Sequence, residues 1–118
     1  MVSIHKTAVI GSNVVFGTNV SIGAYAVIDD NVKIANDNTI KSSVYITGNT
    51  DIGNANIFYP FCSIGSPPQD LKFKNEVTNL IIGSNNIFRE HATVNVGTKG
   101  GGGTTKVGDN SLFMIGAH

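Results

Sequence analysis

One polar loop and three histidines carry the side chains of this sequence that suit acid–base or ligand chemistry. The loop segment SPPQDLKFK places Gln69, Asp70 and Lys72 close together in the chain. Asp accepts hydrogen bonds from hydroxyl groups, Gln both donates and accepts them, and the Lys ammonium supplies a point charge for a phosphate. These residues are candidates for binding a hydroxylated or phosphorylated ligand, although a solvated loop needs no ligand to be polar.

The histidines are His5, His91 and His118. An imidazole titrates near neutral pH, so it serves as a general base or a metal ligand. His91 and His118 neighbour small residues, Ala92 and Ala117, that the repeat described below turns inward, so both imidazoles are expected to point outward. For His5 and His91 the plainer interpretation is a surface or subunit-contact residue, whereas His118 is the stronger candidate for a functional role.

A metal centre and a phosphate-binding loop are both disfavoured. A catalytic zinc site needs three protein ligands, and no third histidine follows to join His91 and His118. The glycine run at 100–103 superficially resembles a phosphate-binding loop. That motif needs Gly-Lys followed by Ser or Thr, whereas here Lys106 lies between Thr105 and Val107. We expect neither a metal nor another cofactor.

The element that must position these side chains is a repeat of six residues. Helices repeat every 3.6 residues and strands every 2, so neither explains this period, whereas fixed hexapeptide repeats are typical of a parallel β-helix. A mostly small residue stands two positions before each large apolar one. The large series is Ile4, Ile10, Phe16, Ile22, Ile28, Ile34, Ile40, Ile46, Ile52, Phe58 and Ile64, and the smaller residues are Val2, Ala8, Val14, Val20, Ala26, Val32, Val44, Thr50 and Cys62.

Three hexamers are expected to close one triangular coil. The large aliphatic residue fills the interior, the small residue lies nearer the corner, and stacked coils pair their backbones as parallel strands. Such coils wind left-handed, so the predicted fold is all-β, a left-handed parallel β-helix of about six coils. Four asparagines share the fourth place of their hexamers, where a sharp corner can require positive φ. They are Asn13, Asn19, Asn31 and Asn49.

A single β-helix domain is expected over residues 1–118, with two excursions from the repeat. The first, 66–79, carries prolines and charged residues, and the repeat resumes in phase at Ile82. The second, 96–106, holds four consecutive glycines, and the repeat returns at Val107. Loops on a rigid scaffold are common places for functional residues.

Composition narrows the partners and the compartment. Lys plus Arg equals Asp plus Glu at 8 each, which argues against nucleic acid and anionic lipid as partners. The single cysteine excludes an internal disulfide, and no apolar run is long enough to insert in a membrane. A soluble cytoplasmic protein is the expectation. The repeat stops in mid-pattern at residue 118 without a cap, which favours a fragment over a naturally short chain.

Four segments together resemble the UDP-N-acetylglucosamine O-acyltransferases that begin lipid A synthesis. They follow the family's order over the whole chain, with both excursions in the family's places. Other acyltransferases and carbonic anhydrases share the repeat, but the QDLK loop joined to the glycine-rich segment is much more specific. The segments are IHKTAVIGSNVVFGTNVSIGAYAVI, SIGSPPQDLKF, IIGSNNIFRE and GGGTTKVGDNSLFMIGAH.

The resemblance implies a homotrimer with active sites between neighbouring β-helices. An (R)-3-hydroxyacyl group would move from acyl carrier protein to the 3-hydroxyl of UDP-N-acetylglucosamine (UDP-GlcNAc). A histidine would remove the hydroxyl proton, and a backbone N–H would support the oxyanion. Carried over by motif, Gln69 and Asp70 would contact the sugar. Lys72 would lie near the sugar nucleotide or the acyl donor, and His118 would help to hold the acyl hydroxyl.

The sequence also departs from the family. The family's general base is a histidine three residues beyond the position of His118, and its oxyanion glycine, final coils and helical C-terminal domain are absent too. We therefore expect the 118-residue chain to be inactive by itself. Asn95-Val96 stands where many members carry His-Arg. Three alternatives stay open: another hexapeptide acyltransferase, such as the N-acyltransferase of the same pathway, a non-catalytic β-helix scaffold and, third, a metal-dependent carbonic anhydrase, which metal analysis of the purified protein would test.

Overall fold

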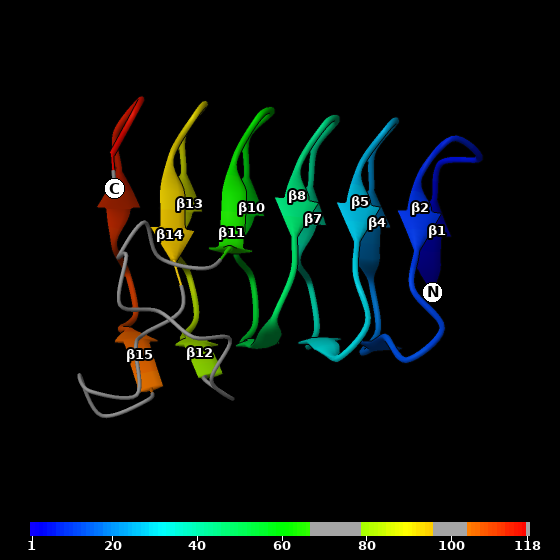
Figure 1. Cartoon of the computed structure of the whole chain (residues 1–118), viewed down its shortest axis with the longest axis horizontal. Helices are drawn as coiled ribbons and strands as arrows, with labels where there is room; N and C mark the ends of the chain where they lie inside the picture. The colour runs from blue at the N-terminus through cyan, green and yellow to red at the C-terminus, as the bar shows by residue number, and fades with distance from the viewer. Residues whose placement is uncertain (67–78, 96–103, 118) are drawn as a thin grey trace.

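The computed structural model describes residues 1–66, 79–95 and 104–117, and these residues form β-strands joined by tight corners. Every third strand joins the same parallel sheet, so three sheets form the faces of a coil whose turns stack along the long axis of the molecule (Figure 1). No helix occurs among the described residues. The all-β parallel β-helix that the hexapeptide period predicts is therefore confirmed.

We call the three faces sheet A, sheet B and sheet C. Sheet A comprises β1 (Val2–Ile4), β4 (Val20–Ile22), β7 (Thr39–Ile40), β10 (Ile57–Phe58), β13 (Ile87–Phe88) and β16 (Leu112–Phe113). Sheet B comprises β2 (Val9–Ile10), β5 (Val27–Ile28), β8 (Tyr45–Ile46), β11 (Ser63–Ser66) and β14 (Thr93–Asn95). Sheet C comprises β3 (Val15–Phe16), β6 (Val32–Ile34), β9 (Asn49–Ile52), β12 (Asn79–Ile82) and β15 (Thr104–Val107).

The register between coils follows the sequence period. Ile4 pairs with Ile22, and Ile22 pairs with Ile40, so equivalent residues lie directly above one another at intervals of 18 residues. Because side chains alternate across a strand, each inward residue then stacks on the inward residue of the next coil. The predicted 18-residue coil is thus confirmed in the plain part of the repeat.

The interior is the apolar column that the repeat predicts. Ile28, Ile46 and Ile64 are fully buried, and Cys62 lies among them in the core. Three inward phenylalanines form a stack in which the Phe58 and Phe113 rings each lie 4.7 Å from the Phe88 ring. Ile4 is 42% exposed, because the first coil has a neighbouring coil on one side only.

A buried ladder of asparagines is the main feature of the core that the repeat did not predict. Asn38, Asn56 and Asn86 take inward positions and are at most 1% exposed. The Asn38 Oδ1 accepts a hydrogen bond from the backbone N–H of Asn56 at 2.8 Å, and the Asn56 Oδ1 accepts one from Asn86 N–H at 2.9 Å. The ladder satisfies buried backbone donors and so fixes the height of each coil above the last.

The prediction of positive φ at corner asparagines is half right. Asn19 and Asn31 have φ of 58° and 68°. For Asn49 it is wrong, because Gly48 takes the positive φ of 76° one residue earlier and Asn49 begins β9. It is also wrong for Asn13, which is not among the residues with positive φ.

At the ends that the structure describes, the strands extend further into the two excursions than the sequence predicted. Ser66 still belongs to β11, and Asn79 already belongs to β12. Residues 104–106, expected in the second excursion, lie in β15 and pair with β12. The backbone at these ends therefore keeps the parallel pairing of the coil.

Candidate functional site

The four residues predicted to bind substrate, Gln69, Asp70, Lys72 and His118, lie outside the described residues. The structure does describe the positions at which the chain enters and leaves both excursions. Their geometry shows from which part of the scaffold the two excursions leave and where they return.

Both excursions leave and rejoin the same corner, the one between sheets B and C. Where they leave, Ser66 of β11 pairs with Asn95 of β14. Where they return, Asn79 of β12 pairs with Thr104 of β15. We call this corner the excursion corner. The two loops that the sequence singled out are therefore rooted side by side, although about 30 residues separate them along the chain.

The exit into the first excursion depends on one glycine. Gly65 has φ of 86°, in the left-handed region that favours glycine. A Cβ at this position would clash with the carbonyl oxygen of Thr47 and would lie 2.6 Å from Thr50 Oγ1. On either side of it, the hydroxyls of Ser63 and Ser66 are 2.8 Å apart and hydrogen-bonded. The local sequence thus interrupts the regular pairing of β11 with β14 where the chain enters the first excursion.

The last described residue before the predicted site residue His118 is Ala117, and it lies against sheet B. The backbone N–H of Thr93 in β14 donates a 2.7 Å hydrogen bond to the carbonyl of Ala117. Ala117 therefore stacks on the coil from which the second excursion leaves. His118 itself lies outside the described residues, so its outward orientation stays a prediction.

The other two histidines lie at the corner between sheets A and B. His91 is exposed, as predicted, and its ring stacks on that of Phe61 with centroids 5.2 Å apart. Beside this pair, Arg89 and Lys41 lie over the Tyr59 ring, 4.6 and 5.2 Å from its centroid. We call these residues the aromatic corner. His5 is also exposed, and its Nδ1 is hydrogen-bonded to a nearby hydroxyl.

Cys62 has no reactive role in this arrangement. Its thiol donates to the backbone carbonyl of Arg89 at 3.0 Å and is buried in the core. Burial raises the pKa of the Cys62 thiol to about 11, so the nucleophilic thiolate is scarce near neutral pH. Its inward, core position was predicted from the repeat and is confirmed.

Two further observations concern metals and membranes. Within residues 1–66, 79–95 and 104–117, no three His, Cys, Asp or Glu side chains gather in a way that would hold a metal ion. The same part of the chain has no helix long and apolar enough to cross a membrane.

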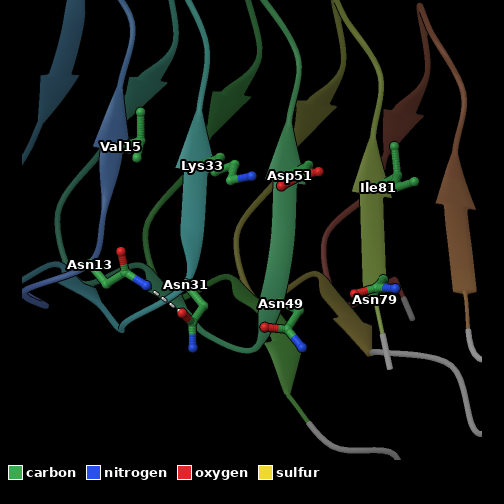
Figure 2. A pocket seen from close by; sticks show the side chains of 8 residues that line it. All are labelled: Asn13, Val15, Asn31, Lys33, Asn49, Asp51, Asn79 and Ile81. Atoms are coloured by element: carbon green, nitrogen blue, oxygen red, sulfur yellow. Dashed lines mark hydrogen bonds between the residues drawn. The ribbon is translucent and has the colours of Figure 1, made fainter. Parts of the chain in front are cut away.

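A groove beside the excursion corner was not predicted from the sequence. It has a volume of about 440 Å³ and runs over the outward face of sheet C (Figure 2). Two of its residues, Asn79 and Ile81, come directly after the first excursion. Its other residues belong to the plain first half of the repeat, where only the corner asparagines were singled out from the sequence.

Three parallel sheets wound from hexapeptides and carrying loops at one corner define a class, the left-handed parallel β-helix proteins of the hexapeptide-repeat type. Solved structures of this class superpose closely on the chain. The UDP-N-acetylglucosamine acyltransferase (LpxA) of Bacteroides fragilis matches with a TM-score of 0.92 and 43% identity, over 96% of this chain and 44% of that one. LpxA of Acinetobacter baumannii matches with a TM-score of 0.93 and 40% identity, over 95% and 43%.

Sequence comparison leads to the same family. The acyl-[acyl-carrier-protein]–UDP-N-acetylglucosamine O-acyltransferase of Rickettsia bellii is 48% identical over 98% of this chain and 41% of its own length. That of Rickettsia canadensis is 52% identical over 98% and 44%. No protein-family model matches the chain. By sequence and by fold, the chain is a relative of the UDP-N-acetylglucosamine O-acyltransferases, as its motifs indicated, and it spans about two fifths of their length.

Proposed function

We propose that this chain supplies part of the acceptor site of an acyltransferase. The enzyme would move an (R)-3-hydroxyacyl group from acyl carrier protein to the 3-hydroxyl of UDP-GlcNAc. The observation that carries the proposal is that both excursions, with the motif residues of this family, are rooted at one corner of a scaffold 48% identical to a relative of that name.

The chemistry that follows needs few groups. The 3-hydroxyl oxygen attacks the thioester carbonyl, the C–O bond forms, and the C–S bond breaks to release the thiol of the carrier. A histidine base takes the hydroxyl proton and returns it to the leaving sulfur. Within this sequence, Gln69 and Asp70 would bind the sugar hydroxyls, Lys72 would attract a phosphate or the donor, and His118 would hold the acyl hydroxyl. In this proposal the chain contributes binding groups, and another part of the enzyme would supply the general base.

The test of this proposal is nucleotide-sugar binding. UDP-GlcNAc is titrated into the chain, and Asp70→Asn is expected to weaken binding about tenfold or more, because a hydrogen bond to a charged group is lost. Asp37→Asn is the matched control, since Asp37 is an exposed aspartate at the corner between sheets C and A that accepts a bond from Asn19. Equal affinity of both variants and the wild type would refute the role of Asp70.

Two enzyme assays separate the alternatives. Stronger competition by the sugar nucleotide with a free glucosamine amine than by UDP-GlcNAc would indicate the N-acyltransferase of the same pathway. Turnover by the 118-residue chain close to that of a full-length relative would contradict the expectation that its general base lies elsewhere.

A homotrimer is part of the proposal, with the aromatic corner at the subunit contact. Phe61 of that corner is 58% exposed, and Tyr25 and Ile115, also between sheets A and B on other coils, are 69 and 64% exposed. By contrast, sheet C directs exposed charged residues, such as Lys33 and Asp51, toward solvent. Exposed apolar side chains gathered along one edge are typical of a protein–protein contact. A cytoplasmic location completes the proposal and agrees with a single, unpaired cysteine.

Sedimentation velocity tests the trimer. Phe61→Glu is expected to shift the chain from trimer toward monomer, because it places a charge in an apolar contact. Lys106→Glu, on the exposed face of sheet C, is the control and leaves the trimer intact. A monomeric wild type, or growth of particle size with concentration, would instead favour the scaffold alternative.

A further inference from the structure

The groove on sheet C spans four successive coils, so it follows the long axis of the β-helix (Figure 2). The coils are about 4.8 Å apart, which makes the groove about 14 Å long. Its residues form two parallel rows, one of corner amides and one of outward strand side chains. The rows are Asn13, Asn31, Asn49 and Asn79, and Val15, Lys33, Asp51 and Ile81.

Several polar groups in the groove have no partner in the described part of the chain. The Asn13 Nδ2 donates to the Asn31 Oδ1 at 2.6 Å, which leaves the Nδ2 of Asn31 unbonded among the described residues. The side chain of Asn79 makes no hydrogen bond to the described residues either. Lys33 and Asp51 pair in register on β6 and β9, yet they form no ion pair there. The groove therefore offers a ligand hydrogen-bond donors and acceptors, together with one positive and one negative charge.

The chemistry of the groove excludes several ligand classes. One lysine beside one aspartate gives no net attraction for a phosphate. An acyl chain would bury the amides without hydrogen bonds, which is costly. The side chains on one face of an extended peptide recur about every 6.6–6.8 Å, and this spacing does not match the distance of about 4.8 Å between coils.

A second copy of this chain is the remaining protein candidate. With the two coils antiparallel, Lys33 of each copy would face Asp51 of the other, so the charges are complementary. The two hollow faces would, however, enclose an unfilled space between them, and interfaces of stable complexes are packed as densely as protein interiors. Packing therefore favours a ligand that fills the hollow.

We propose that the groove binds a neutral oligosaccharide extended along the stack of coils. Sugar hydroxyls would pair with the amides of Asn31 and Asn79 and with the charged groups of Lys33 and Asp51. The apolar faces of the sugar rings would lie over Val15 and Ile81, which are 56 and 38% exposed. A straight, β-linked chain advances by a step comparable to the spacing of the coils, so successive sugars meet equivalent side chains.

The experiment is an NMR titration of the chain with cellotriose, a straight β-linked trisaccharide, against maltotriose, its curved α-linked counterpart. Shifts at the side-chain amides of Asn31 and Asn79 are expected, with a dissociation constant for cellotriose near 1 mM and weaker binding of maltotriose. Asn31→Ala and Asp51→Ala are each expected to weaken binding about tenfold. Asn54→Ala removes an equally exposed amide at another corner and serves as the control.

Each other outcome overturns the proposal. No shift in the groove at millimolar cellotriose, or equal loss of binding in the Asn54→Ala control, would show that the groove is not a saccharide site. Groove shifts that depend on protein concentration without sugar, and that Lys33→Asp removes, would show that a second copy occupies it. The substitutions and the sugars of this test differ from those of the Asp70→Asn titration with UDP-GlcNAc, so failure of one proposal is distinguishable from failure of the other.

Discussion

Substitution of Asn56 tests whether the buried asparagine ladder holds the coils together. The Asn56 side chain is 0% exposed, and it makes three hydrogen bonds. Its Oδ1 accepts from Asn86 N–H at 2.9 Å, and its Nδ2 donates to Asn38 Oδ1 at 3.1 Å and to the Gly83 carbonyl at 2.9 Å.

Asn56→Ala should lower the free energy of unfolding because it leaves buried polar groups without hydrogen-bond partners. The Asn86 N–H loses its partner inside the core, and the part-buried Gly83 carbonyl loses one of its own. Asn38 Oδ1 still accepts a hydrogen bond from the backbone N–H of residue 56 at 2.8 Å, so it keeps a partner. An unsatisfied buried group costs about 1–3 kcal/mol, so the free energy of unfolding should fall by about 2–4 kcal/mol.

Urea unfolding followed by circular dichroism measures this loss, and a second variant separates hydrogen bonding from space filling. Asn56→Leu keeps the branched shape of the side chain and fills the space but has no polar atoms, so it should stay destabilised by about 2 kcal/mol or more. Asn54→Ala breaks one exposed bond, from Asn36 N–H at 2.8 Å, which water replaces, so it should cost less than about 1 kcal/mol. Wild-type stability of Asn56→Leu would refute the reasoning, because filling the space would then be sufficient.

Three further predictions concern the core and its corners. Phe88→Ala removes the middle ring of the phenylalanine stack and should lower the free energy of unfolding by about 3–5 kcal/mol, whereas a loss below about 1 kcal/mol would mean that the stack contributes little. Gly65→Ala should cost about 1–3 kcal/mol in backbone strain alone, while Gly108→Ala, whose added Cβ meets nothing within 4 Å, should be near neutral in the same urea series. The Cys62 thiol, whose pKa is raised from 9.0 to about 11, should react with iodoacetamide about 100-fold more slowly in the folded chain than in urea, and similar rates would contradict its burial. Because folding raises that pKa, the protonated Cys62 thiol contributes fully to the free energy of unfolding below pH 9, and this contribution is lost as the pH rises through about 11. A pH series of urea midpoints would detect the loss.

Some local conformations could not be predicted because neighbouring coils override local preference. Tyr25 and Phe61 adopt φ of 59° and 69°, although aromatic residues rarely occupy this region. The corner between sheets A and B takes that bend from the second coil onward, at Ser43 and His91 as well, and the stacked strands on either side impose it. The sequence signal pointed to asparagine, and it succeeded at Asn31 but failed at Asn49, where a preceding glycine supplies the bend.

Part of the candidate site could likewise be predicted from the sequence, and part depends on the fold. The QDLK loop and the glycine run are identifiable from the sequence, because they interrupt a strict period and match a family. Their common root at the excursion corner depends on pairing between residues far apart in the chain, Ser66 with Asn95 and Asn79 with Thr104. The groove depends on stacking too, since neighbouring residues within each of its two rows are 18 or more positions apart in the chain.

The sequence by itself determined the fold of this protein, because a period of six satisfies only one kind of backbone path and the inward Ile and Val residues bury one another in it. It also identified the family, through the loops that break the period. Only the tertiary structure decided which polar residues are buried and which surfaces are built across coils. Asn38 and Asn31 are both asparagines of the repeat, yet one lies inside the coil and the other lines a groove. The residues above and below each of them in the stack determine that difference.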